Sequence, residues 1–150
     1  MNKDFRDILA LLQDEGAVFL IVGAHALAVH GYLRATGDLD LWIRPDPENA
    51  ERVWRALLRF GAPVEALNLS QADLEKPGIV FQIGLPPRRI DILTEISGVD
   101  FDEAWPNRVT QTVDGLEAPF LGREALLRNK QESGRDKDLA DLRALTKKKA

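Results

Sequence analysis

Residues 17–43 read AVFLIVGAHALAVHGYLRATGDLDLWI, and this stretch decides the fold. The compact apolar run 18–22 predicts a buried strand that ends at Gly23. The alanine-rich residues 24–30 predict a short helix after this glycine. Large apolar residues alternate with aspartate at the start of 39–43, which predicts a second strand. We therefore expect a strand, a short helix and a second strand in direct succession.

The rest of the chain adds further helices and strands on both sides of this unit. Apolar residues at helical spacing predict helices over 2–15 and 46–60, and one or two helical turns are expected within 70–75. The later elements are strands over 79–85 and 89–95, a loop or short helix over 102–107, a hairpin of 109–113 with 118–121, and helices over 122–132 and 135–147. This order predicts an α/β (α+β) fold, with helices packed on a mixed β-sheet.

Length and composition indicate one domain over residues 1–150, with a C-terminal helical part at about 122–148. The chain has no cysteine, which excludes a thiolate nucleophile, a zinc–thiolate site and an iron–sulfur cluster. The N-terminus lacks an apolar signal core, and the most apolar stretch, 17–29, is too short to span a bilayer. We expect a soluble, cytoplasmic protein without a membrane partner.

Charge is distributed unevenly along the chain. Residues 1–120 hold 11 basic and 19 acidic side chains, a net charge of −8, whereas residues 121–150 hold 9 and 5, a net charge of +4. An acidic body argues against binding extended duplex DNA, where many phosphates must be neutralised. The basic end could hold a nucleotide or an RNA terminus, and the alternative is a solvated helix face.

Three aspartates form the candidate catalytic and metal site. Successive strand residues point to opposite faces, so Asp38 and Asp40 project the same way, about 6.6 Å apart along the strand. Paired carboxylates suit Mg²⁺, and Asp91 on a neighbouring strand would complete a site for two metal ions. The alternative for Asp91 is an ion pair with Arg88, Arg89 or Arg34. An Asp-x-Asp pair alone also occurs on exposed strands and in loop caps.

Gly23 lies between a buried strand and a helix. A glycine there lets the backbone approach a phosphate, and the following helix N-terminus offers free N–H groups. The alternative is an ordinary strand-to-helix turn. His25, two residues later, could reach a phosphate or a base, or could pack as a hydrogen-bonded core histidine.

Taken together, residues 17–43, 88–95 and 124–142 resemble the polymerase-β-like nucleotidyltransferase superfamily. Its signature is a strand that ends in Gly-Ser, a short helix, Asp-x-Asp on the next strand and a third Asp on a later strand. Gly23, Asp38, Asp40 and Asp91 match this signature. Ala24 stands where the superfamily has the serine that contacts the triphosphate. Backbone N–H groups, His25 or Thr36 would take over that contact.

The chain more closely resembles small bacterial proteins akin to the AbiEii toxins of type IV toxin–antitoxin systems. Those proteins carry a Gly-Gly-x-Ala-like opening, an Arg-x-(Ser/Thr)-x-Asp-x-Asp block, and a late Lys followed by Arg-x-Lys-Asp-x-x-Asp-Leu. The corresponding segments here are GAHA at 23–26, RATGDLD at 34–40, Lys130, and RDKDLADL at 135–142.

The resemblance implies a minimal nucleotidyltransferase fold and an enzyme that transfers NMP from an NTP with Mg²⁺ or Mn²⁺. The acceptor would be an RNA end such as a tRNA 3′ end, a protein or a small-molecule hydroxyl, and a cognate antitoxin would be a possible partner. The implied catalytic and metal residues are Asp38, Asp40 and Asp91. The implied nucleotide-binding residues are Gly23, Ala24, His25, Arg34, Thr36 and Lys130.

Two other functions stay open at this point. The fold could serve as a binding or regulatory module with weakened chemistry, because Ala24 replaces the serine. Clustered carboxylates argue against that alternative, since idle acids would destabilise the fold. A glycosyltransferase that uses Asp38 and Asp40 on a nucleotide sugar is a third possibility, although such domains are usually larger.

Overall fold

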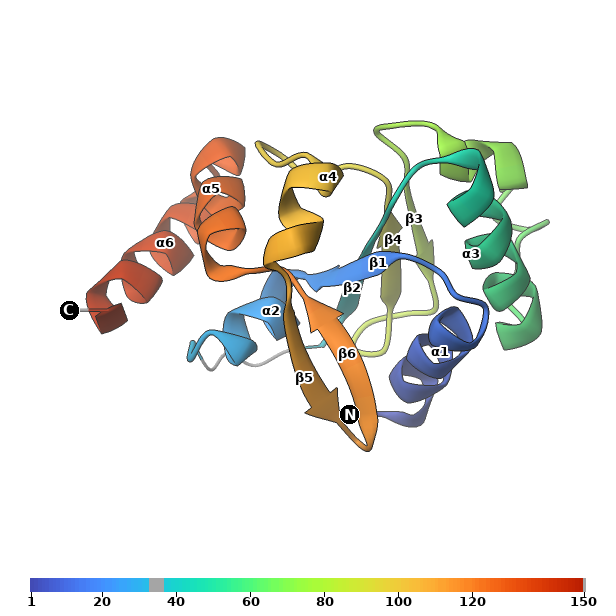
Figure 1. Ribbon diagram of the computed structural model, residues 1–150, viewed down its shortest axis with the longest axis horizontal. Coiled ribbons are helices and arrows are strands. Elements are labelled where there is room, and N and C mark those ends of the chain that lie inside the picture. Colours follow the sequence, from blue (N-terminus) through green and yellow to red (C-terminus); the bar gives the residue numbers. More distant parts are fainter. Residues whose placement is uncertain (33–36, 150) are drawn as a thin grey trace.

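The computed structural model describes residues 1–32 and 37–149 and contains a six-stranded mixed sheet flanked by helices (Figure 1). Along the sheet, the strands follow the order β3 (Val80–Ile83), β4 (Ile90–Leu93), β2 (Leu39–Ile43), β1 (Phe19–Val22), β6 (Leu116–Phe120) and β5 (Val109–Val113). Strand β2 pairs antiparallel with β1 and parallel with β4, whereas β1 pairs parallel with β6. The edge strands β3 and β5 pair antiparallel with their neighbours β4 and β6. The expected α/β sheet is confirmed.

Six α-helices and two short 3₁₀ helices complete the described part of the chain. They are α1 (Lys3–Asp14), α2 (Gly23–Val29), α3 (Pro47–Phe60), η1 (Gln71–Glu75), α4 (Phe101–Ala104), η2 (Trp105–Asn107), α5 (Arg123–Ser133) and α6 (Asp136–Lys149). Helix α1 packs against α3, and α5 packs against α6. Figure 1 shows the α5–α6 pair at the end of the molecule opposite to α3.

Local sequence signals explain the helix ends. Asp46 caps α3, because its side chain accepts a hydrogen bond from the backbone N–H of Asn49 at 2.7 Å. Pro47 stands in the first turn, and Gly61 ends the helix with a φ of +85°. The expected helix over 46–60 is therefore confirmed.

Within the described residues, no helix combines the length and apolar character that crossing a bilayer requires.

The strand boundaries differ slightly from the sequence expectations. The expected strand 79–85 ends earlier, at Ile83, because Gly84 adopts a φ of +81° and turns the chain. The last hairpin starts its second strand at Leu116 rather than at Ala118. Asp114 and Gly115 both have positive φ, which forms a tight two-residue turn and pairs Val113 directly with Leu116.

The register of the central strands places the aspartates. Asp40 lies beside Val22 of β1 on one side and beside Asp91 of β4 on the other. The end of β1 and the beginnings of β2 and β4 therefore meet at one edge of the sheet. Asp38 directly precedes β2 at this edge.

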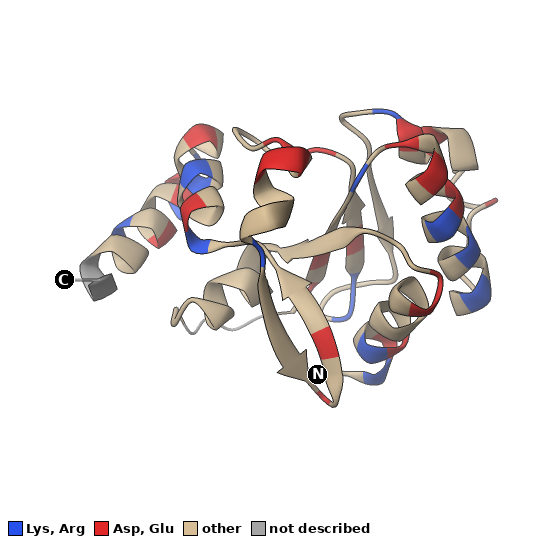
Figure 2. Ribbon diagram, in the orientation of Figure 1, with Lys and Arg blue, Asp and Glu red and all other residues tan. Residues whose placement is uncertain are grey.

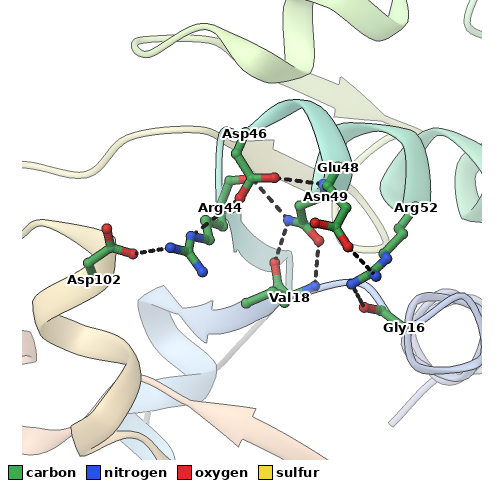
Figure 3. A network of polar contacts seen from close by, with 8 residues as sticks. All are labelled: Gly16, Val18, Arg44, Asp46, Glu48, Asn49, Arg52 and Asp102. Atoms are coloured by element: carbon green, nitrogen blue, oxygen red, sulfur yellow. Dashed lines mark hydrogen bonds and ion pairs between the residues drawn. The ribbon is translucent and has the colours of Figure 1, made fainter.

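Asn49 ties the beginning of α3 to the residues just before β1 and just after β2, which lie side by side (Figure 3). Its side chain is 2% exposed. Its Oδ1 accepts from the N–H of Val18 at 2.7 Å, and its Nδ2 donates to the carbonyls of Val18 and Arg44 at 2.8 and 2.9 Å. One side-chain amide thus satisfies three backbone groups: the N–H and carbonyl of Val18, just before β1, and the carbonyl of Arg44, just after β2.

We expect Asn49→Ala to lower the free energy of unfolding by about 2–4 kcal/mol, because buried backbone groups would lose their partners. Urea unfolding followed by circular dichroism measures the change. Asn107→Ala is the matched control, since Asn107 is exposed and its Nδ2 makes a single bond, to the carbonyl of Glu103 at 3.2 Å. Equal losses in the two variants would contradict the assigned role of Asn49.

Candidate active site

A cleft of about 700 Å³ opens at the sheet edge where β1 ends and β2 and β4 begin. Its opposite wall is built by α5, the turn after it and the beginning of α6. Figure 2 shows acidic positions on the central strands β2 and β4, and mixed charges on α5. Six of the nine expected site residues line this cleft: Gly23, Ala24, Asp38, Asp40, Asp91 and Lys130.

The other three expected residues are not placed in the cleft. Arg34 and Thr36 lie outside the described residues. His25 is described but is not part of the cleft lining. Its ring packs edge-on against Phe5, with centroids 5.8 Å apart, and burial lowers the pKa of the imidazole. These contacts favour the packing interpretation of His25 over a phosphate contact.

Asp40 carries the strongest electrostatic perturbation in the cleft. Burial of its carboxyl group raises the pKa, and the negative charge of Asp91 and a hydrogen bond with Asp91 raise it further. Asp38 adds a smaller effect in the same direction, and the pKa of Asp40 reaches about 7. The Asp40 carboxyl group therefore takes up a proton near neutral pH.

Arg89 balances the remaining charge. Its Nε and Nη2 donate to the two carboxylate oxygens of Asp91 at 2.8 and 3.2 Å. The same Nη2 lies 3.1 Å from Oδ2 of Asp38, and the backbone N–H of Arg89 donates to Oδ1 of Asp38 at 3.3 Å. The ion pair considered for Asp91 is therefore present, and it coexists with the grouping of the three aspartates.

Gly23 makes room for Asp40. Its φ is +69°, and a Cβ built on it would overlap Oδ2 of Asp40. A side chain at this position is therefore excluded twice, by backbone conformation and by space. The glycine identified in the sequence positions a carboxylate directly, in addition to forming the turn from β1 into α2.

Lys130 lies in the wall opposite the aspartates and is only 6% exposed. Its Nζ is 3.2 Å from Oδ1 of Asp138 and 3.2 Å from Oδ2 of Asp141, so two buried carboxylates balance its charge. Although burial opposes ionisation of Asp138, hydrogen bonds from Arg135, Ser133 and Lys130 hold its pKa well below the usual range. Lys130 is therefore buried and not solvent-facing, and this ion-pair cluster ties α5 to α6.

The donor chemistry of the cleft fits a hard divalent cation. Three carboxylates gather at one point, and a proton and a guanidinium group offset their repulsion. In the present arrangement, no group of three His, Cys, Asp or Glu residues within 1–32 and 37–149 is set to hold a metal ion. In the same arrangement, Arg89 engages both oxygens of Asp38 and of Asp91.

Sequence reasoning missed how Arg89 bridges two aspartates. The signal was available, because Arg89 stands two residues before Asp91 at the start of the same strand, where side chains two apart share a face. Arg135 and Lys137 also line the cleft, whereas sequence reasoning identified them only as part of the 135–142 motif. Their place in the wall depends on the packing of α6 against α5, which spacing along the chain does not define.

We expect Gly23→Ala to displace the Asp40 carboxylate and to lower the free energy of unfolding by about 1–3 kcal/mol beyond the backbone strain. Gly31→Ala is the matched control. It has a similarly positive φ of +91°, but a Cβ there would meet no atom within 4 Å. Chemical denaturation of both variants measures the difference, and equal destabilisation would show that Asp40 does not need this space.

Asp40→Asn should change the pH dependence of stability. Because the folded-state pKa of Asp40 is raised to about 7, its contribution is fully present below the ordinary pKa of about 3.9 and is lost as pH rises through 7. The neutral variant should thus melt above wild type at pH 8, and the gap should shrink toward pH 5. Thermal unfolding across this range tests the trend. Glu65→Gln, at an exposed carboxylate, should show no such trend, and a pH-independent gap for Asp40→Asn would contradict the assignment.

Comparisons with known proteins agree with this geometry. The structure is similar to a crystal structure from Thermotoga maritima that is described as a proposed nucleotidyltransferase, with a TM-score of 0.60. This match covers 96% of the chain and 91% of the other protein at 17% sequence identity, so it shows the fold alone. No functionally curated protein matches the sequence. A family described as "Nucleotidyl transferase of unknown function (DUF2204)" matches residues 1–150. The chain therefore belongs to this nucleotidyl transferase family and has a nucleotidyltransferase-like fold.

Proposed function

We propose that this protein is a divalent-metal-dependent nucleotidyltransferase that transfers an NMP group from an NTP to an acceptor hydroxyl. The observation that carries this proposal is the meeting of Asp38, Asp40 and Asp91 in one cleft, held by strand register and by the absence of a side chain at Gly23. Membership of the nucleotidyl transferase family supports the same reaction class.

In the proposed reaction, the acceptor oxygen forms a bond to the α-phosphorus and pyrophosphate leaves. Asp38, Asp40 and Asp91 would hold Mg²⁺ or Mn²⁺, which supplies charge neutralisation at the phosphates and activation of the hydroxyl. A proton acceptor is needed for the acceptor hydroxyl. Asp91, which lies beside Asp40 in the strand register, would take this proton.

The opposite wall would orient the triphosphate. Arg135 and Lys137 line the cleft, and the Arg135 side chain is 71% exposed although it contacts Asp138. Lys130 acts differently in this proposal, because its ammonium group is already bound by two buried carboxylates. It would hold α5 and α6 in place and so keep this wall of the cleft in position. The resemblance implied that Lys130 binds the nucleotide. In this proposal, Lys130 contributes to nucleotide binding only indirectly.

For the acceptor, we propose an RNA end of the tRNA type as the first to test. The C-terminal 30 residues carry a net charge of +4 and contribute one wall of the cleft, whereas the rest of the chain is acidic. Such a distribution favours contact with a terminus over contact with a long duplex. The AbiEii-like motifs extend the proposal to a cytoplasmic toxin–antitoxin setting, in which a cognate antitoxin would be the protein partner.

A second candidate is a binding or regulatory module without transfer activity. Two observations favour it: Ala24 lines the cleft where related enzymes carry serine, and Arg89 engages two of the three aspartates. In that case, Arg89 would be a permanent counter-ion and the cleft would bind no metal.

The test is incubation with each α-labelled NTP, Mg²⁺ or Mn²⁺, and total bacterial RNA. We expect label to move into RNA or protein with the wild type and to fall to background with the Asp38→Ala, Asp40→Ala double variant. A Glu65→Ala, Glu75→Ala double variant changes the charge equally at two exposed residues outside the cleft and should behave as wild type. Absence of transfer, together with absence of metal-dependent NTP binding, would favour the binding module.

A further inference from the structure

Arg89 occupies the position in which a cation would satisfy the carboxylates. Its guanidinium group bonds both oxygens of Asp91 and lies 3.1 Å from Oδ2 of Asp38. Its own backbone N–H takes the other oxygen of Asp38. A single residue thus engages four of the six carboxylate oxygens of Asp38, Asp40 and Asp91, and the remaining two belong to Asp40, which lies beside Asp91.

A divalent cation and this guanidinium group need the same atoms. Mg²⁺ and Mn²⁺ bind carboxylate oxygens directly, and those oxygens are already acceptors in charge-assisted hydrogen bonds. Positive charge from Arg89 would also repel an incoming cation at close range. Both effects oppose metal binding for as long as Arg89 stays in place.

We propose that Arg89 is an autoinhibitory counter-ion that must leave Asp38 and Asp91 before a divalent metal binds. The inference rests on the proposed function, because it concerns the same carboxylates. Arg89 can leave, since its side chain is 27% exposed and stands at the mouth of a large cleft. The site thus exists in two forms, one closed by the guanidinium group and one open to metal.

The buried cluster on the opposite wall shows by contrast why Arg89 is suited to this exchange. Lys130 also bridges two carboxylates, those of Asp138 and Asp141, but its side chain is 7% exposed and theirs are 1% and 3% exposed. Removing that cation would leave buried charges without a partner. Arg89 and its partners have more access to solvent, so a metal ion and water can replace the guanidinium group there.

Direct Mn²⁺ binding to the protein without nucleotide tests the proposal, measured by the loss of the free-ion electron paramagnetic resonance signal. We expect Arg89→Gln to bind Mn²⁺ about tenfold more tightly than wild type, because the competing charge-assisted bonds are absent. Arg88→Gln is the matched control, since it removes the same charge from the adjacent, exposed residue. Its affinity should stay within about twofold of wild type.

Arg89→Lys provides a second variant that keeps the charge but lacks the planar fork that engages two carboxylates at once. It should bind Mn²⁺ with an affinity between those of wild type and Arg89→Gln. Circular dichroism and thermal unfolding establish that each variant is folded. If Arg89→Gln does not fold, Arg89→Lys decides the question, and an affinity equal to wild type would overturn the inference.

The outcomes separate this inference from the proposed function. If wild type, Arg88→Gln and Arg89→Gln all bind Mn²⁺ equally well, or Arg89→Gln binds more weakly, Arg89 does not compete with metal and the metal-dependent function stands. If folded Arg89→Gln binds no Mn²⁺ even with NTP present, the autoinhibitory role of Arg89 and the proposed metal-dependent function are both wrong. The binding module is then favoured.

Discussion

Mutual repulsion among three carboxylates is the constraint around which this fold is organised. Asp38 and Asp40 come from one segment and Asp91 from another, and each carboxylate would be more stable in water than beside the other two. They stay together because strands β2 and β4 pair in parallel, with Asp40 beside Asp91, and because Gly23 leaves space for the Asp40 carboxylate. The pKa of Asp40 is raised in consequence, first by burial of its carboxyl group and then by the neighbouring charge of Asp91.

The fold handles clustered acids in two different ways on the two sides of the cleft. On the α5–α6 side, Lys130 is enclosed with Asp138 and Asp141, so the cluster is a fixed structural tie. On the sheet side, Arg89 reaches Asp38 and Asp91 from a more accessible position. An enclosed ion pair is difficult to break because each charge left behind lacks solvent. An accessible one can exchange its cation, which is the property that a catalytic metal site requires.

Much of this architecture follows from the sequence, since the signals are local. The strand at 39–43 and the helix over 46–60 were predicted correctly because alternation, capping residues and Gly61 all act within a few residues. Spacing alone grouped Asp38 with Asp40. Placing Asp91 beside them depended on the family resemblance, because the order of strands in a sheet does not follow from local spacing. The structure places Asp40 beside Asp91 and thereby supplies the pairing that the motif implied.

The side-chain partners were less predictable for a physical reason. A lysine in a helix is normally solvated, and only the packing of α6 on α5 shows that Lys130 is buried between two carboxylates. His25 was left open between phosphate contact and packing, and its contact with Phe5 depends on where α1 lies. Burial and ion pairing are properties of tertiary packing, so a single sequence indicates candidates for them without assigning partners.

The choice between an enzyme and a binding module depends on what a cluster of acids does for a protein that never binds metal. Above neutral pH, ionisation of Asp40 beside Asp91 destabilises the folded protein. The positive charge of Arg89 offsets only part of this effect, since the pKa of Asp40 stays raised despite it. Local arrangements that lower stability are expected mainly where function requires them. A bound divalent cation would reverse the effect, because carboxylates that repel one another in the free protein become a matched set of ligands. The electrostatic destabilisation at this sheet edge therefore supports the proposed cation site over the binding-module alternative.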